Sequence, residues 1–247
     1  LPPGLAAYYS ASASAVTGSN AAVTRLYDLS DFGRDMGNVL GAPLYTPTNA
    51  NGLPAIRFYA TDGTDAMWTD YNFDALTDYS VVSVDRFTGG ANNRIITSRT
   101  RNWLFSHHGG GDGRWYAEGW ITPQGGNANT LWDVSAGDIN GITNPQGNFW
   151  YNGAQNATNN QGSHDWAYAP GILQLGAWGT GYGEASNGEV SDLLIFNRVL
   201  TAAERNSVAS YLTSRYAVTN TYTATAFANA AVLGDLRLAP NTQATIT

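Results

Sequence analysis

What the sequence lacks sets the first limits on the protein. The 247-residue chain contains no Cys, which excludes disulfide bonds and thiolate metal sites. It contains no Lys either, so all twelve basic side chains are Arg, and with 19 acidic residues the formal net charge is −7. No basic run is present to contact phosphates, and this charge repels a polyanion. The composition therefore argues against a nucleic-acid partner.

Long apolar runs and charge are also scarce. No apolar run approaches the length of a transmembrane helix, so we expect no membrane span. Charged residues make up 13% of the chain and hydrophobic residues 43%, which is typical of a globular protein rather than a disordered one. The length suits one all-β domain with a full core. The chain begins at Leu1, as expected of a processed product or a segment of a longer protein.

The clearest local pattern lies between Gly188 and Tyr216. Gly188–Phe196 has apolar residues on both faces, which favours a strand covered on both sides: Val190, Leu194 and Phe196 share one face, and Leu193 and Ile195 the other. Thr201-Ala-Ala-Glu204 is a capping box and predicts a helix over 202–215. Its buried stripe would contain Val208, Tyr211, Leu212 and Tyr216.

Upstream segments indicate strands at fairly even spacing, as in a sandwich. They are Leu5–Tyr9, Pro54–Phe58, Ser80–Phe87, Arg94–Ser98, Trp103–Phe105, Trp115–Ile121 and Leu173–Gly176. Ser80–Phe87 alternates like a half-buried strand, with Val82 and Val84 on one face and Ser83 and Asp85 on the other. Gly109–Gly113 is expected to be a flexible loop, the stretch 122–148 is dense in turn residues, and Asn152-Gly153 fits a type I′ hairpin turn.

Several of these pieces resemble one family. The strand, Asn197-Arg198-x-Leu200 and Thr201-x-x-Glu204 order, together with Phe149-Trp-Tyr-Asn-Gly153 and Leu173-Gln-Leu-Gly176, is similar to laminin-G-like, concanavalin-A-like domains of bacterial secreted proteins. The resemblance implies an all-β fold: a two-sheet antiparallel jelly-roll sandwich with one short C-terminal helix, over residues 1–218. It also implies an extracellular or cell-surface location. It says little about function, because one fold hosts many functions.

Catalytic motifs are missing. Glycosidases of similar fold need two carboxylates about 5 Å or more apart and carry a Glu-x-Asp-x-x-Glu strand. The nearest match, Glu189-Val-Ser-Asp192, has the wrong spacing and no second Glu. Gly-x-Ser-x-Gly and His-Glu-x-x-His are also absent. We therefore expect no enzyme, and a hydrolase or lyase with an unfamiliar site is the weakest alternative.

Candidate metal ligands are acidic loop residues. Asp62, Asp65 and Asp112 offer the hard oxygens that Ca²⁺ prefers, and many laminin-G-like domains hold one calcium ion at the sandwich rim. The competing interpretation is that Asp-Gly here simply forms turns. His107 and His108 are adjacent, so on a strand they point to opposite faces and are not expected to serve one site.

Aromatic residues are the most suggestive feature, with eight Trp and fourteen Tyr. Sugar rings stack on aromatic side chains, although aromatics also fill sandwich cores. Those beside Gly-rich loops are the candidate ligand-binding residues: Trp103, Trp115, Trp120, Trp178 and Tyr182. The favoured function is non-catalytic extracellular recognition or adhesion, with a glycan or another cell-surface ligand bound by a concave sheet face and its rim loops.

The Thr/Ala-rich tail over residues 219–247 lies beyond the family resemblance. Its few large apolar residues cannot form a core of their own. Val232–Leu238 alternates weakly and is expected to form a strand paired with a sheet or packed on a neighbouring copy. This feature motivates the second hypothesis, in which the protein is a structural subunit of a surface filament, coat or virion that self-associates through the sandwich and residues 219–247.

Overall fold

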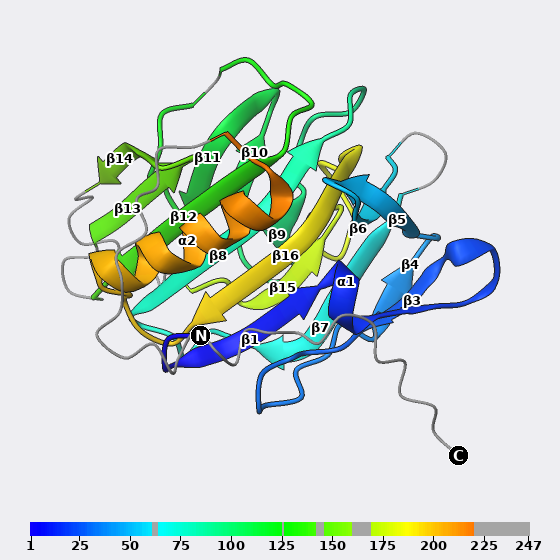
Figure 1. Cartoon of the computed structure of the whole chain (residues 1–247), viewed down its shortest axis with the longest axis horizontal. Coiled ribbons are helices and arrows are strands. Elements are labelled where there is room, and N and C mark those ends of the chain that lie inside the picture. Colours follow the sequence, from blue (N-terminus) through cyan, green and yellow to red (C-terminus); the bar gives the residue numbers. More distant parts are fainter. Residues whose placement is uncertain (61–63, 125, 142–145, 160–168, 220–247) are drawn as a thin grey trace.

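The computed structural model describes residues 1–60, 64–124, 126–141, 146–159 and 169–219, which form two antiparallel sheets and a helix on the outside (Figure 1). The larger sheet has eight strands in the order β14-β13-β12-β8-β16-β6-β5, with β1 also paired to β16. Its strands are β1 (Leu5–Ser10), β5 (Leu44–Ala50), β6 (Leu53–Phe58), β8 (Tyr79–Phe87), β12 (Asp133–Asn140), β13 (Gln146–Tyr151), β14 (Ala154–Asn159) and β16 (Gly188–Phe196).

The smaller sheet has six strands in the order β11-β10-β9-β15-β7-β4. They are β4 (Asn38–Leu40), β7 (Ala66–Asn72), β9 (Ile96–Ser98), β10 (Trp103–His108), β11 (Gly111–Ala117) and β15 (Ile172–Leu175). The remaining elements are the ribbon of β2 (Ala15–Thr17) and β3 (Val23–Leu26), the short helices α1 (Ala11–Ser14) and η1 (Ser19–Ala21), and α2 (Ala202–Tyr216). The predicted all-β sandwich with a helix near its C-terminal end is confirmed.

Strand β16 is buried along its whole length, as predicted. It pairs with β8 on one side and with β1 and β6 on the other. The register shifts between Val190 and Asp192, so Val190 joins Leu193 and Ile195 in the core between the sheets. The prediction that Val190 shares a face with Leu194 was wrong, because a bulge reverses the alternation that a regular strand would keep.

Helix α2 begins as the capping box predicts. The Thr201 hydroxyl accepts a hydrogen bond from the Glu204 backbone N–H at 3.3 Å, and the Glu204 carboxylate accepts one from the Thr201 N–H at 2.9 Å. The helix lies across the outer face of the larger sheet (Figure 1). There, Val208 and Leu212 join a hydrophobic cluster with Val82 of β8.

Strand β8 is buried on both faces, whereas its alternation predicted a half-buried strand. Val82 and Val84 lie under α2, while Ser83 and Asp85 point into the interior between the sheets and are 0% exposed. The smaller sheet covers Ser83 and Asp85, so the polar positions of β8 are buried as well as its valines. Asp85 is therefore a buried acid that needs partners.

Two loop predictions also changed. Only Gly109 and Gly110 form the turn between β10 and β11, both with positive φ (57° and 78°), and Gly111 already lies in β11. Part of the turn-rich stretch 122–148 is β12, whose residues Asp133–Ile139 are all buried. The Asn152-Gly153 turn is confirmed, with φ values of 47° and 92° between β13 and β14.

Two further predictions concern the C-terminal tail and a membrane span. Residues 220–247, including the strand expected at Val232–Leu238, lie outside the described residues. Within the described ranges, no helix is long and apolar enough to cross a membrane.

Candidate functional site

The five aromatic residues predicted to bind a ligand fall into two groups. Trp103 and Trp115 are 0% exposed and belong to the core between the sheets, whereas Trp120, Trp178 and Tyr182 are half-buried. The prediction that Trp103 and Trp115 are accessible beside loops was wrong. Alternation along β10 and β11 points both indoles inward.

The shape of the larger sheet makes room for these core aromatics. At Gly137 in β12, a Cβ atom would lie 2.5 Å from the Trp115 ring and 2.9 Å from the Phe105 ring. Phe105 and Trp115 meet edge to face with centroids 5.3 Å apart. The Trp103 indole N–H donates a hydrogen bond to the Tyr79 hydroxyl at 3.0 Å. These rings fill the core, so the candidate surface must be built from the other aromatics.

The outer face of the smaller sheet is covered at its centre. A row of cross-strand partners on this face runs through Asn38, Trp68, Gln174, Thr97, Leu104 and Tyr116. Gln174 and Thr97 are 0% exposed although they point away from the core. The loop over residues 176–187 contributes to their cover, because the Gln174 amide donates a hydrogen bond to the Gly179 carbonyl at 3.0 Å. The expected open sheet face is thus replaced in part by a loop surface.

Aromatic and arginine side chains lie against one another in this covering layer. The Arg99 guanidinium carbon lies 4.1 Å from the Trp68 ring centroid and 5.3 Å from that of Tyr182. That of Arg94 lies 4.4 Å from the Trp178 ring centroid. These are cation–π distances. We call Trp68, Arg94, Arg99, Trp178 and Tyr182 the aromatic–arginine face.

A cavity of about 440 Å³ opens beside this face, with Arg99, Arg101, Asn102, Trp178 and Thr180 among its lining residues. The Trp178 indole N–H donates a hydrogen bond to the Arg101 carbonyl at 3.0 Å, and Arg101 pairs with Asp74 at 2.8 Å. The indole is therefore held in one orientation before any ligand arrives. The sequence singled out Trp178 and Tyr182, but not Trp68 or Arg99, because it gave no sign that these four residues are neighbours.

Glu184 connects the aromatic–arginine face to Trp120. Its carboxylate accepts from Arg94 Nε at 2.6 Å and lies 3.1 Å from His108 Nε2. The His108 ring in turn packs edge to face on Trp120 at 5.4 Å. Burial alone would raise the pKa of Glu184, but Arg94 and His108 outweigh burial and hold it below its ordinary value. Trp120 thus extends the same side of the sandwich.

A second cavity, of about 820 Å³, was not predicted. Phe32, Arg34 and Tyr71 line it, and the Arg34 guanidinium carbon lies 3.7 Å from the Tyr71 ring centroid and 4.3 Å from that of Phe32. Phe32 is 55% exposed and Tyr71 38% exposed. The sequence held one sign of this cavity, a large apolar residue between turn residues, at Asp31-Phe32-Gly33.

The three predicted metal ligands do not form one site in the described structure. Asp62 lies outside the described residues. Both carboxylate oxygens of Asp65 accept backbone N–H bonds, from Ala42 at 2.8 Å and from Tyr59 at 2.9 Å, so Asp65 supports a loop. Asp112 instead groups with His107 and Asp133. Calcium binding stays a prediction.

Asp112 belongs to a buried group that we call the His107 cluster: Asp85, His107, Asp112 and Asp133. His107 Nδ1 lies 2.7 Å from Asp85 Oδ2, and His107 Nε2 lies 3.3 Å from Asp112 Oδ1 and 3.4 Å from Asp133 Oδ2. Burial opposes protonation of His107, but the surrounding carboxylates outweigh it and raise the pKa of the imidazole. His107 and His108 do point to opposite sides, as their adjacency on a strand predicts.

No protein-family model and no curated protein matches this sequence. Solved structures do match, among them domain 4 of AbnA, a GH43 extracellular arabinanase from Geobacillus stearothermophilus, in complex with arabinotriose. It is 16% identical with a TM-score of 0.55, and the match covers 83% of this chain and 98% of that one. Trypanosoma rangeli sialidase in complex with sialic acid is 14% identical with a TM-score of 0.54, over 90% of this chain and 34% of that one.

The binding domain of botulinum neurotoxin DC in complex with SialylT also matches. It is 12% identical with a TM-score of 0.56, and the match covers 85% of this chain and 51% of that one. The chain therefore spans nearly all of the arabinanase domain, but only a third to a half of the sialidase and toxin chains. At this identity the matches show a shared β-sandwich fold. They agree with a jelly roll without singling out the laminin-G-like kind.

Proposed function

We propose that this chain is a non-catalytic glycan-recognition domain of a secreted or cell-surface protein, and that the glycan binds at the aromatic–arginine face. One observation carries the proposal: the cavity of about 440 Å³ places an indole, Trp178, next to Arg101 and Asn102. An aromatic ring can stack on the apolar face of a sugar, while guanidinium and amide groups hydrogen-bond its hydroxyls. The arabinanase domain, which shares this fold over nearly its whole length and was solved in complex with arabinotriose, supports this choice of ligand class.

Binding without catalysis is supported by the burial of the His107 cluster. A glycosidase needs two carboxyl groups that flank an accessible glycosidic bond. The side chains of Asp112 and Asp133 approach each other near His107, but they are only 5% and 2% exposed. A polysaccharide cannot reach them in this conformation.

The charge of Arg99 favours an acidic sugar. Arg99 bonds Gln174 Oε1 at 3.0 Å and the Tyr182 hydroxyl at 3.3 Å, both neutral groups. No described carboxylate lies within ion-pair distance of it, in contrast to Arg94 and Arg101. A ligand carboxylate beside Arg99 would make a charge-assisted hydrogen bond, which is about twice as strong as a neutral one. We propose that an oligosaccharide with one acidic sugar binds more tightly than its neutral counterpart, because a single carboxylate is repelled far less by the net charge of −7 than a polyanion is.

An array of neutral oligosaccharides and of matched oligosaccharides with one acidic sugar tests this proposal, probed with the wild type, Trp178→Ala and Trp132→Ala. Trp132 is the matched control, because it is also a half-buried Trp with an arginine beside it, Arg86, whose guanidinium carbon lies 4.7 Å from the ring centroid. It packs instead against the hydrophobic cluster of the larger sheet. Loss of a central aromatic contact costs about 2 kcal/mol or more, so we expect Trp178→Ala to bind at least about tenfold more weakly and Trp132→Ala to bind as the wild type does.

The possible results separate the hypotheses. Unchanged binding by folded Trp178→Ala would move the site elsewhere, with the cavity at Phe32 and Tyr71 as the next candidate. Absence of binding to every glycan would contradict the recognition proposal. That result would leave the structural-subunit hypothesis.

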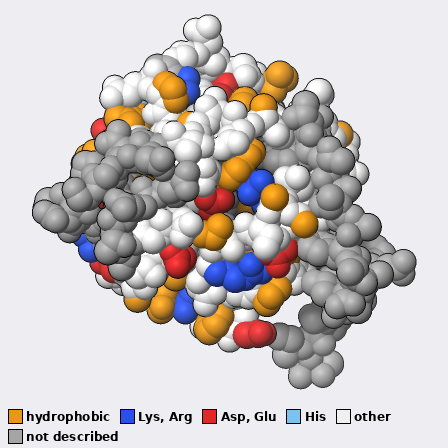
Figure 2. All heavy atoms as spheres, turned by 90° about the vertical axis from the view of Figure 1, so that its left-hand side faces the viewer, with side chains coloured by type: hydrophobic (Ala, Val, Ile, Leu, Met, Phe, Trp, Pro, Cys, Tyr) orange, Lys and Arg blue, Asp and Glu red, His pale blue; other side chains and the backbone are white. Residues whose placement is uncertain are grey.

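No described residue gives specific support to the structural-subunit hypothesis. On the face shown in Figure 2, hydrophobic side chains of the described residues lie in small groups separated by charged and polar ones. A stable self-association surface usually has a more continuous apolar centre. The segment 220–247, through which copies would associate, lies outside the described residues. Self-association and a virion location stay predictions.

A further inference from the structure

The His107 cluster joins the two sheets at a point that the proposed glycan site does not use. His107 comes from β10 and Asp112 from β11 of the smaller sheet, while Asp85 and Asp133 are direct partners on β8 and β12 of the larger sheet. His107, Asp85 and Asp133 are almost completely buried. Charged side chains are rarely buried in this way unless they are paired or coordinate a metal ion.

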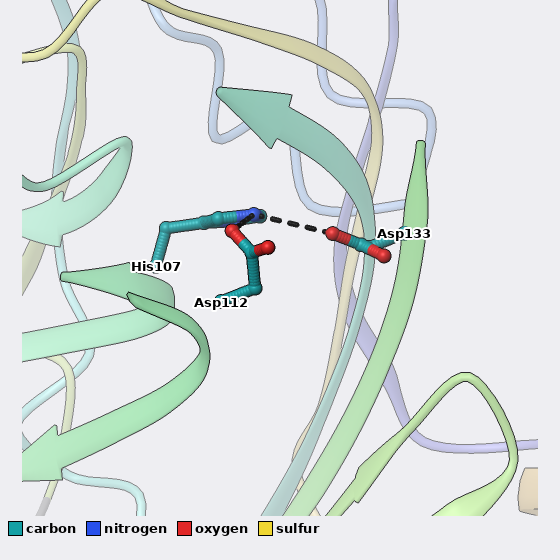
Figure 3. Close-up of side chains that lie close together, drawn as sticks. All are labelled: His107, Asp112 and Asp133. Carbon is teal, nitrogen blue, oxygen red and sulfur yellow. Dashed lines mark ion pairs between the residues drawn. The ribbon is translucent and has the colours of Figure 1, made fainter. Parts of the chain in front are cut away.

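Three atoms of the cluster are buried without a well-formed hydrogen bond. They are His107 Nε2, Asp112 Oδ1 and Asp133 Oδ2, and among the described residues their contacts are the ion-pair distances of 3.3 and 3.4 Å from His107 Nε2 to the two oxygens. The three side chains point toward one another (Figure 3), and their ligand atoms lie within 4.8 Å of one another. Unsatisfied buried polar atoms are uncommon and costly. Three that converge on one point indicate a species that all of them bind.

The opposite atoms of the same side chains are firmly held. Metal-ligating imidazoles usually donate their other N–H to a carboxylate, and ligating carboxylates are in turn hydrogen-bonded. Each of the three side chains has such support: His107 Nδ1 to Asp85 Oδ2 at 2.7 Å, Asn129 N and Nδ2 to Asp112 Oδ2 at 2.9 and 2.6 Å, and Asn152 Nδ2 to Asp133 Oδ1 at 2.8 Å.

Two of the three distances between the converging atoms match a small cation, and the third is within 4.8 Å. Ligands about 2.0–2.1 Å from a tetrahedral ion lie about 3.3–3.4 Å apart. His107 Nε2 lies at these distances from the two carboxylate oxygens, 3.3 and 3.4 Å. Ca²⁺ prefers six to eight oxygen ligands at longer distances, whereas an imidazole with carboxylates suits Zn²⁺ and its neighbours.

We propose that His107 Nε2, Asp112 Oδ1 and Asp133 Oδ2 bind a divalent transition-metal ion, with Zn²⁺ the best fit, and that the ion ties the two sheets together. Asp85 acts as a positioning residue that orients the imidazole. This proposal does not depend on glycan binding. The rival interpretation is that a protonated His107 alone balances the carboxylates.

The test uses chelator-treated protein that is given Zn²⁺ and then dialysed, with bound metal measured per chain. His107→Gln is compared with His108→Gln, the adjacent residue, whose ring faces Glu184 on the other side of the sheet. We expect one ion per chain in the wild type and in His108→Gln, and at least about a hundredfold weaker binding in His107→Gln. Asp85→Asn should weaken binding about 10- to 100-fold. Added Zn²⁺ should raise the melting temperature of the wild type and His108→Gln only.

A second measurement needs no variant, in case His107→Gln does not fold. Co²⁺ added to the wild type should give the intense visible absorption of a four-coordinate site, and Zn²⁺ should displace it. The proposal is overturned if the wild type retains no ion and gives no such spectrum, or if folded His107→Gln binds as tightly as the wild type. The first of those results would leave His107 as a buried protonated histidine.

Discussion

The two faces of β10 differ in how many partners a polar side chain has. His108 points outward, where its ring is partly exposed and Glu184 is its polar partner. His107 points inward, where three carboxylates from three other strands surround it. An outward polar group can be solvated by water, but an inward one must find every partner within the fold. A buried polar cluster is therefore a stronger sign of a specific role than an exposed aromatic residue.

The largest expected effect is a difference in the free energy of unfolding between variants of two tryptophans, both of which the sequence predicted to bind a ligand. Trp115 is fully buried against Phe105 and Gly137, whereas Trp178 is half-buried beside a cavity. Trp115→Ala should lower the free energy of unfolding by about 3–5 kcal/mol, because it leaves a large void. Trp178→Ala should cost about 1 kcal/mol or less.

Urea denaturation followed by circular dichroism measures both. Equal losses for the two variants would contradict the division into core and surface aromatics. They would also weaken the use of Trp178→Ala as a binding variant.

The next effect concerns two Asn-Gly turns, one with a half-buried asparagine that contacts a buried acid and one with an exposed asparagine. Asn152 and Asn51 both have positive φ, 47° and 52°. The Asn152 amide donates a hydrogen bond to the buried Asp133 carboxylate at 2.8 Å, whereas Asn51 donates to the Arg215 carbonyl on the surface at 3.1 Å. Each Ala substitution adds about 1 kcal/mol of backbone strain.

Only Asn152→Ala also removes a bond to a buried charge, worth about 1.5–3 kcal/mol. We therefore expect a loss of about 2–4 kcal/mol for Asn152→Ala and about 1–2 kcal/mol for Asn51→Ala, measured by urea denaturation. If the two losses were equal, the Asp133 carboxylate would not depend on this support.

Much of the fold could be predicted from local patterns. The buried strand Gly188–Phe196, the capping box at Thr201 and the turn at Asn152 each depend on residues close in sequence, so their signals are visible there. Strand β12 was missed, because Ser135, Ala136 and Gly137 do not look like strand residues until the aromatic rings that pack over them are known.

The candidate site was less predictable, because its members meet only in three dimensions. Trp178 and Tyr182 were found from their Gly-rich loop, but Trp68 and Arg99 come from other parts of the chain. For the His107 cluster, the alternation of β8 placed Asp85 on a polar face without revealing that a second sheet covers this face. Asp112 was chosen for calcium, but the side chains with which it could share a metal ion, His107 and Asp133, lie on other strands.

A smaller effect is expected for a capping bond at the surface. Thr201 is exposed, and its hydroxyl accepts a hydrogen bond from the Glu204 N–H at 3.3 Å and donates one to the Glu204 carboxylate at 3.0 Å. Thr201→Ala should lower the free energy of unfolding by about 1 kcal/mol, while Thr201→Ser should change it little because the hydroxyl is kept. A loss as large as that of Asn152→Ala would mean that outward polar groups matter as much as inward ones.

The smallest effect should come from Glu204, an ion-paired acid near the surface. Its carboxylate makes two bonds to Arg198, at 2.7 and 2.9 Å, and these bonds, together with those from Thr201, lower the pKa of Glu204 from its ordinary 4.5 to about 2. Because the pKa is lower in the folded state, the pair stabilises the protein above about pH 4.5, and this stabilisation is lost as the pH falls toward 2. Water screens the pair, so we expect it to contribute about 0.5–1 kcal/mol at neutral pH.

Glu204→Gln keeps an acceptor for the capping box but removes the charge. The difference in unfolding free energy between the variant and the wild type, measured in urea from pH 7 down to pH 3, should therefore shrink steadily below pH 4.5. A difference that stayed constant would assign the effect of Glu204 to its hydrogen bonds rather than to its charge.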